Sequence, residues 1–61
     1  MRILITGCNG QLGNEIQLLE KFSPQHTYFN TDVAELDITN QQAVETFVEQ
    51  NHIDGIINCA A

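Results

Sequence analysis

The sequence predicts an α/β fold with the order β-α-β-α-β and three parallel strands. Short runs of β-branched and apolar residues alternate along the chain with segments whose apolar residues recur at helical spacing. Strands that alternate with helices in this way pair in parallel and are joined by right-handed crossovers. With 61 residues, the chain has room for one small domain.

The first predicted strand covers residues 2–6 (RILIT), whose β-branched and apolar side chains are typical of a buried strand in a parallel sheet. A turn at residues 7–10 leads into a helix that we predict from Gln11 to about Phe22. The Ser-Pro pair that follows is expected to end this helix. The apolar side chains of the helix are those of Leu12, Ile16, Leu18, Leu19 and Phe22.

The second half of the chain continues the alternation. Residues 27–32 (TYFNTD) are rich in aromatic and β-branched side chains and predict a second strand, followed by a connection. Thr39 is the expected N-cap of a second helix, because Gln42 completes a capping box with it. This helix runs to about Asn51, and residues 55–59 (GIINC) form the third predicted strand. The apolar face of the second helix comprises Ala43, Val44, Phe47 and Val48.

The charge of the chain bears on its partners. The net charge is −6 at pH 7, and Arg2 and Lys21 are the two basic residues. This balance argues against binding nucleic acid or an acidic membrane surface through charge. No apolar run is long enough to span a bilayer, and Met1 leads into a strand rather than into the apolar segment of a signal peptide.

The cysteines and histidines indicate the cellular compartment of the protein and whether it binds a metal ion. Cys8 and Cys59 form neither a CxxC motif nor a disulfide framework, so we expect reduced thiols in a cytoplasmic protein. His26 and His52 lie at no ligand spacing relative to them, which predicts no metal site. Cys8 has two interpretations: a reactive thiol at the start of a helix, or a residue that fills a tolerant position of the turn.

The segment that indicates a ligand-binding site is TGCNGQLG at residues 6–13, which contains a G-x-x-G-x-x-G pattern. The pattern is specific because of its context: it directly follows a predicted buried strand and begins a predicted amphipathic helix. Gly7 lets the chain turn off the strand, Gly10 leaves room for a pyrophosphate, and Gly13 lets the helix pack closely on the strand. The pattern therefore predicts a dinucleotide-binding turn and the N-terminal half of a Rossmann fold with three parallel strands.

The start of the first helix is the predicted phosphate contact. The N–H groups of Gln11 and Leu12 are expected to point at the phosphates, where the helix dipole favours negative charge. The absence of a Gly-Lys-Ser/Thr sequence excludes a Walker A loop.

Asp32 ends the second predicted strand, about 20 residues beyond the glycine turn, where the acid that binds the adenosine ribose is expected. A carboxylate there repels a 2′-phosphate, and no arginine follows to receive one, which favours NAD(H) over NADP(H). The alternative interpretation of Asp32 is an ordinary solvent-facing acid at a strand end.

Two further elements have competing interpretations. Asp37 could receive the adenine amino group while Ile38 packs on the ring, or Asp37 could simply form a turn. The small residues after Asn58, which include Ala60 and Ala61, could let the central riboses of the cofactor approach the backbone, or could serve packing alone.

The chain stops at the carboxyl end of an apolar strand, the edge of an open α/β sheet where ligands bind. A three-stranded parallel sheet would also leave an apolar edge exposed. We therefore expect residues 1–61 to be the N-terminal part of an NAD(P)-binding Rossmann domain in a longer chain.

The segments MRILITGCNGQLGNE, TDVAELDIT and IDGIINCAA resemble the N-terminal part of the dTDP-4-dehydrorhamnose reductase family, within the extended short-chain dehydrogenase/reductases. The resemblance covers essentially the whole chain. It implies pyrophosphate contacts at Gly10, Gln11 and Leu12. It also implies that Asp32 binds the adenosine ribose, that Asp37 and Ile38 bind the adenine, and that Ala61 lies near the nicotinamide.

The resemblance further implies an enzyme that uses NADH or NADPH to reduce dTDP-4-dehydro-L-rhamnose to dTDP-L-rhamnose, a nucleotide sugar of surface polysaccharide biosynthesis. Cys59 and Gly55 depart from the alanine and the β-branched residue usual in the family. Its catalytic Tyr-x-x-x-Lys pair has no counterpart here, because Asp32 stands four residues after Tyr28. The catalytic residues of the parent enzyme are thus expected outside residues 1–61.

Two alternatives to this enzyme stay open. A protein of the same superfamily could keep the NAD(P) site and act as a non-catalytic regulatory subunit, or the 61 residues could be an inert truncation. The sequence is compatible with a homodimer and leaves the oligomeric state open.

Overall fold

A computed structural model describes residues 1–59 of the chain. Its elements are β1 (Arg2–Thr6), α1 (Gln11–Glu20), β2 (Thr27–Asn30), α2 (Gln41–Gln50) and β3 (Gly55–Asn58). This order confirms the predicted β-α-β-α-β fold. No helix among the described residues is both long and apolar enough to cross a membrane.

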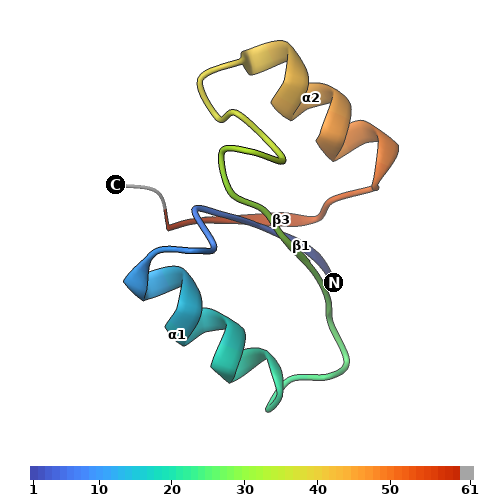
Figure 1. The fold of residues 1–61 in the computed structure, drawn as a ribbon. Coiled ribbons are helices and arrows are strands. Elements are labelled where there is room, and N and C mark those ends of the chain that lie inside the picture. Colours follow the sequence, from blue (N-terminus) through green and yellow to red (C-terminus); the bar gives the residue numbers. More distant parts are fainter. Residues whose placement is uncertain (60–61) are drawn as a thin grey trace.

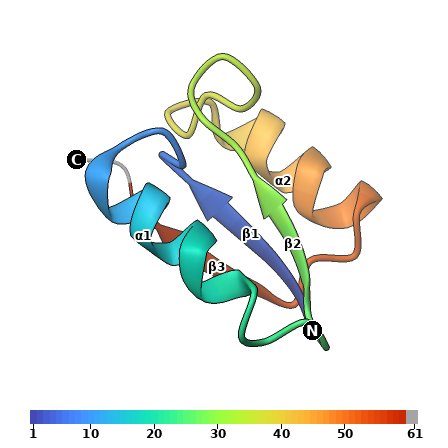
Figure 2. The ribbon, with the colours of Figure 1, turned by 60° about the horizontal axis from the view of Figure 1, so that its bottom comes forward.

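The three strands form one parallel sheet with β1 in the centre and the order β2-β1-β3 (Figure 2). In the register of the sheet, Leu4 of β1 pairs with Phe29 of β2 and with Ile56 of β3. Because β2 and β3 lie on opposite sides of β1, the two crossovers run in opposite directions. Helices α1 and α2 therefore cover opposite faces of the sheet (Figure 1).

The core lies along the central strand. Leu4 and Ile5 are fully buried, and Leu36, in the connection after β2, is 6% exposed. On the α2 side, Phe47 packs edge-to-face on Phe29 with 6.0 Å between the ring centroids. Such aromatic pairs stabilise a core beyond the apolar area that they bury.

The outer edge at β3 is apolar, as expected from the sequence. Ile56 is 54% exposed and Ile57 is 38% exposed, although both belong to a strand of the sheet. Strands with apolar side chains on both faces are typical of the interior of parallel sheets.

The ends of several elements differ from the sequence-based expectation. Helix α1 ends at Glu20, and the N–H of Phe22 donates to the carbonyl of Leu19 in a turn that leaves Phe22 81% exposed. Strand β2 ends at Asn30 and β3 at Asn58, each short of its expected last residue. The N–H of Thr31 still donates to the carbonyl of Ile5, and the N–H of Cys59 to the carbonyl of Thr6, so sheet hydrogen bonds run one residue past the assigned end of each strand. Differences of one or two residues are usual at the ends of elements.

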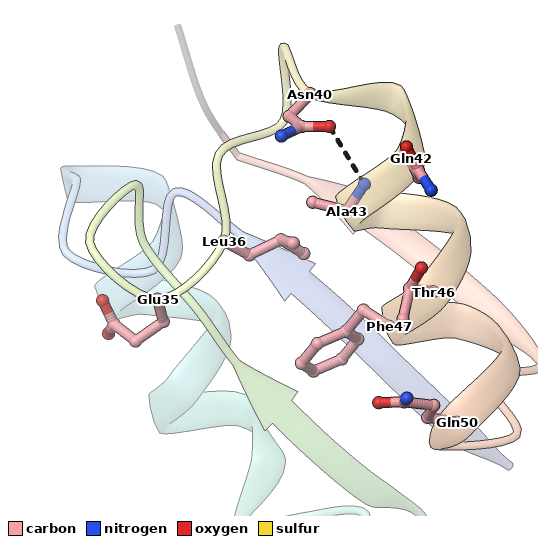
Figure 3. Close-up of a pocket in the computed structure, with 8 residues that line it drawn as sticks. All are labelled: Glu35, Leu36, Asn40, Gln42, Ala43, Thr46, Phe47 and Gln50. Atoms are coloured by element: carbon pink, nitrogen blue, oxygen red, sulfur yellow. Dashed lines mark hydrogen bonds between the residues drawn. The ribbon is translucent and has the colours of Figure 1, made fainter.

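The predicted capping box of α2 is wrong. The N-cap is Asn40, whose Oδ1 accepts a hydrogen bond from the N–H of Ala43 at 3.1 Å (Figure 3). The hydroxyl of Thr39 instead donates to Oδ1 of Asp37 at 2.6 Å. Asparagine and threonine are both good N-caps, so their adjacency made the position ambiguous from sequence.

Candidate functional site

A cavity of about 540 Å³ lies at the carboxyl ends of β1 and β3. The strand order reverses between these two strands, and open α/β sheets bind ligands in the crevice at such a switch point. Five of the residues predicted to bind the cofactor line this cavity. The lining residues are Gly7, Asn9, Gly10, Gln11, Leu12, Asp32 and Cys59.

The three glycines of the turn meet different structural requirements. Gly7 has a φ of 68°, in the left-handed region that disfavours other residues. A Cβ at Gly13 would lie 2.5 Å from the carbonyl oxygen of Gly7, so the close approach of α1 to the turn requires glycine there. Gly10 has ordinary extended dihedrals, and its Cβ would meet nothing closer than 3.5 Å. The fold therefore explains Gly7 and Gly13, and it leaves the glycine at position 10 unexplained.

The N-terminus of α1 presents N–H groups to the cavity. The N–H of Gly10 donates to the carbonyl of Gly7, and the N–H of Asn14 begins the helical pattern by donating to the carbonyl of Gly10. Between them, the N–H groups of Gln11, Leu12 and Gly13 have no hydrogen-bond partner among residues 1–59, and no side chain caps the helix. Of these three residues, Gln11 and Leu12 line the cavity. Free N–H groups at a helix N-terminus suit an anion such as a phosphate.

The carboxylate of Asp32 lies beside this turn. Its Oδ2 accepts a hydrogen bond from the N–H of Asn9 at 3.2 Å, and its Oδ1 accepts one from the N–H of Val33 at 2.7 Å. Both contacts fix the carboxylate at the rim of the cavity, next to the glycine turn. Asp32 is therefore tied to the turn, in contrast to a freely solvated acid at a strand end.

Asn9 also lines the cavity, although no motif of the sequence predicts a role for it. Its contact with Asp32 comes from its backbone N–H, which any residue except proline would supply. No side-chain signal in the sequence could have identified this contact.

Asp37 and Ile38 do not line the cavity. Oδ1 of Asp37 accepts hydrogen bonds from the hydroxyl and the N–H of Thr39, and these bonds lower the pKa of the Asp37 carboxyl. This is the geometry of the turn-forming alternative, and the adenine contact stays a prediction. Ala60 and Ala61, the predicted contacts on the nicotinamide side, lie outside the described residues.

Cys8 and Cys59 differ in their surroundings. Cys8 is 5% exposed, and burial, followed by the nearby carboxylates of Asp32 and Glu35, raises the pKa of its thiol. Cys59 is half-buried and lines the cavity. The structure thus favours Cys8 as a packing residue over Cys8 as a reactive thiol.

We expect iodoacetamide to modify Cys59 faster than Cys8 in the folded chain at pH 8. A raised pKa keeps the Cys8 thiol protonated, and the thiolate is the nucleophile. Mass spectrometry of labelled peptides measures both rates, and unfolding in urea should bring them together. Equal labelling rates in the folded chain would contradict the buried position of Cys8.

A second cavity, of about 460 Å³, lies between α2 and the connection that precedes it (Figure 3). Leu36, Ala43 and Phe47 supply its apolar surface, and Asn40, Gln42 and Gln50 supply carboxamides. None of the residues predicted to bind the cofactor lines it. The cavity at the switch point is therefore the candidate site.

The parallel sheet with its glycine turn at the switch point defines the chain as the N-terminal half of a Rossmann-type fold. Residues 1–61 match the family described as the RmlD substrate binding domain, and the chain belongs to that family.

Two known proteins resemble the chain over almost all of its length. A dTDP-4-dehydrorhamnose reductase of Aggregatibacter actinomycetemcomitans is 38% identical over 60 residues, which cover 98% of this chain and 20% of that protein. The crystal structure of a dTDP-4-dehydrorhamnose reductase from Clostridium acetobutylicum ATCC 824, an RfbD ortholog, aligns with a TM-score of 0.92 and 51% identity. That alignment covers 100% of this chain and 21% of the other. The chain thus spans about a fifth of the length of these relatives, and they confirm the resemblance predicted from the sequence.

Proposed function

We propose that the chain forms the NADH- or NADPH-binding part of a reductase that converts dTDP-4-dehydro-L-rhamnose to dTDP-L-rhamnose. One observation carries the cofactor assignment: free N–H groups at the start of α1 and the carboxylate of Asp32 meet at one cavity at the switch point. The names of the relatives support the reaction.

The residues of the cavity fit a dinucleotide. In the proposed complex, the N–H groups of Gln11 and Leu12 donate to the pyrophosphate, and Gly10 lets it approach the backbone. Asp32 accepts hydrogen bonds from the hydroxyl groups of the adenosine ribose through the remaining lone pairs of its carboxylate. The open space at Gly10 supports this arrangement, since the fold itself does not require glycine there.

The chain binds and orients the cofactor, and the proton for the reduction comes from elsewhere in this proposal. When bound, a reduced nicotinamide supplies a hydride for carbonyl reduction. Tyr28 is not placed to supply the proton, because its hydroxyl donates to the carbonyl of Ser23 in the turn before β2, at the other end of the sheet from the cavity. The family resemblance assigns that step to a Tyr-x-x-x-Lys pair outside residues 1–61.

The charges around the cavity favour NADH over NADPH. Asp32 would face the 2′-phosphate of NADPH with a like charge. Of the two basic residues, Arg2 is engaged at the amino end of β1, where its Nε donates to the carbonyl of Asn51 and its guanidinium lies 4.9 Å from the centroid of Phe29. Lys21 lies at the far end of α1 from the glycine turn.

A fluorescence titration with NADH and with NADPH tests the proposal. We expect the wild-type chain to bind NADH more tightly. Asp32→Ala should weaken NADH binding by about tenfold or more, the value of a hydrogen bond to a charged group. It should also narrow the preference for NADH, because the like charge facing the 2′-phosphate is gone.

Glu49→Ala, which removes an exposed carboxylate of α2, serves as the matched control and should bind like wild type. Circular dichroism with a thermal melt establishes that each variant is folded. A chain that melts cooperatively and binds neither nucleotide would overturn the proposed function.

A further inference from the structure

The peptide group between Cys8 and Asn9 is hydrogen-bonded at both of its ends. Its carbonyl accepts a hydrogen bond from Nε2 of Gln17 at 2.8 Å. Its N–H donates to Oδ2 of Asp32 at 3.2 Å. The carbonyl and the N–H of a trans peptide point in opposite directions, so this one rigid plane bridges a side chain of α1 and the acid that follows β2.

The same helix also supports the next peptide group of the turn. Nδ2 of Asn14 donates to the carbonyl of Asn9 at 3.3 Å, and the N–H of Gly10 donates to the carbonyl of Gly7. The carbonyls of Cys8 and Asn9 thus accept hydrogen bonds from the carboxamides of Gln17 and Asn14, both on α1. Gln17 makes the shorter and more buried of these two contacts.

The contact of Gln17 bears directly on Asp32. A hydrogen bond to the carbonyl polarises the peptide group and strengthens its N–H as a donor. Rotation of the peptide plane would turn the N–H of Asn9 away from Asp32, and the bond from Gln17 opposes that rotation. Gln17 is half-buried and does not line the cavity, so any effect that it has on a ligand must pass through other groups.

We propose that Gln17 is a positioning residue that orients the carboxylate of Asp32 through the Cys8–Asn9 peptide. This inference rests on the proposed dinucleotide site, because it assigns Gln17 a role in holding the acid that binds the adenosine ribose. Gln17→Met and Gln17→Glu keep the length of the side chain and remove its N–H donor. Gln41→Met is the matched control, since Nε2 of Gln41 donates to Glu45 on an exposed part of α2.

The first readout needs no cofactor. In NMR spectra of the ligand-free chain, the amide proton of Asn9 should move upfield in both Gln17 variants, because its hydrogen bond to Asp32 weakens. The amide proton of Val33, which donates to the other oxygen of Asp32, reports whether the carboxylate itself has turned. Gln41→Met should leave both signals unchanged.

The second readout is NADH affinity in a double-mutant cycle. Gln17→Met should weaken NADH binding by about two- to tenfold, the range of one hydrogen bond. In the Asp32→Ala background the same substitution should have little effect, because the group through which it acts is gone. A residue that merely supports the helix would weaken binding equally in both backgrounds.

The outcomes separate this inference from the proposed function. An unchanged Asn9 amide signal, or an equal loss of affinity in both backgrounds, overturns the role of Gln17 while the binding site stands. A folded wild-type chain that binds no NADH overturns both proposals. A shifted Asn9 signal, together with a loss of NADH affinity that occurs only in the chain that keeps Asp32 and not in the Asp32→Ala variant, supports the inference.

Discussion

Replacing Gly13 with alanine is expected to unfold the chain. The added Cβ would lie 2.5 Å from the carbonyl oxygen of Gly7 and 2.6 Å from two backbone atoms of Cys8, and none of these can move as a flexible side chain can. In a solvent-exposed helix, replacing glycine with alanine would stabilise the helix by about 1 kcal/mol. At position 13, helix propensity therefore favours alanine while packing disfavours it. Forcing an extra methyl group against backbone atoms should cost about 3 kcal/mol or more of the free energy of unfolding. That free energy is usually only roughly 3–9 kcal/mol for a domain of 61 residues.

Thermal melts followed by circular dichroism measure this effect. Gly55→Ala is the matched control, because its Cβ would meet only the flexible end of Met1 at 3.4 Å and Gly55 does not have a positive φ. We expect that control to change the free energy of unfolding by about 1 kcal/mol at most. If Gly13→Ala melted like wild type, the close packing of α1 against the turn would be wrong.

The sequence was sufficient to predict the order of the elements and the glycine turn. The first strand contains a run of apolar residues. Its Leu4 and Ile5 are fully buried in the centre of the sheet, between the two helices (Figure 1). The start of α1 at Gln11 follows from the glycine pattern, because Gly10 leaves the strand-to-helix turn in extended geometry. These predictions succeeded where a local pattern and the global fold impose the same conformation.

The remaining details depend on contacts that the sequence does not encode locally. The side chain of Asn40 caps α2, while the hydroxyl of the adjacent Thr39 donates to Asp37. The link from Gln17 to Asp32 passes through a backbone peptide, so it has no side-chain signature. On the sequence alone, Gln17 is a polar residue of a helix with no reason to be distinguished from its neighbours.

Replacing Gly10 with valine is expected to abolish cofactor binding while the chain stays folded. The backbone at Gly10, with φ of −77° and ψ of 175°, suits a β-branched residue, and the Cβ position is in ordinary contact with the carbonyl of Gly7. Valine is a poorer N-cap than glycine, at a cost of about 1 kcal/mol. Its methyl groups would occupy the space in which the proposed pyrophosphate meets the N–H groups of Gln11 and Leu12. Loss of both charge-assisted hydrogen bonds, about 3 kcal/mol, should weaken NADH binding at least about a hundredfold.

Gly10→Ala makes the test graded. Alanine adds one methyl group at the same position, so it should weaken NADH binding less than valine does, while both variants keep a cooperative melt near that of wild type. Gly13→Ala gives the opposite pattern, in which binding is lost together with the fold. If Gly10→Val bound NADH as tightly as wild type, the pyrophosphate could not lie over Gly10. A glycine in this turn is required either by the fold or by the ligand. Position 10 separates these two explanations, because the fold leaves room for a side chain there and the proposed pyrophosphate does not.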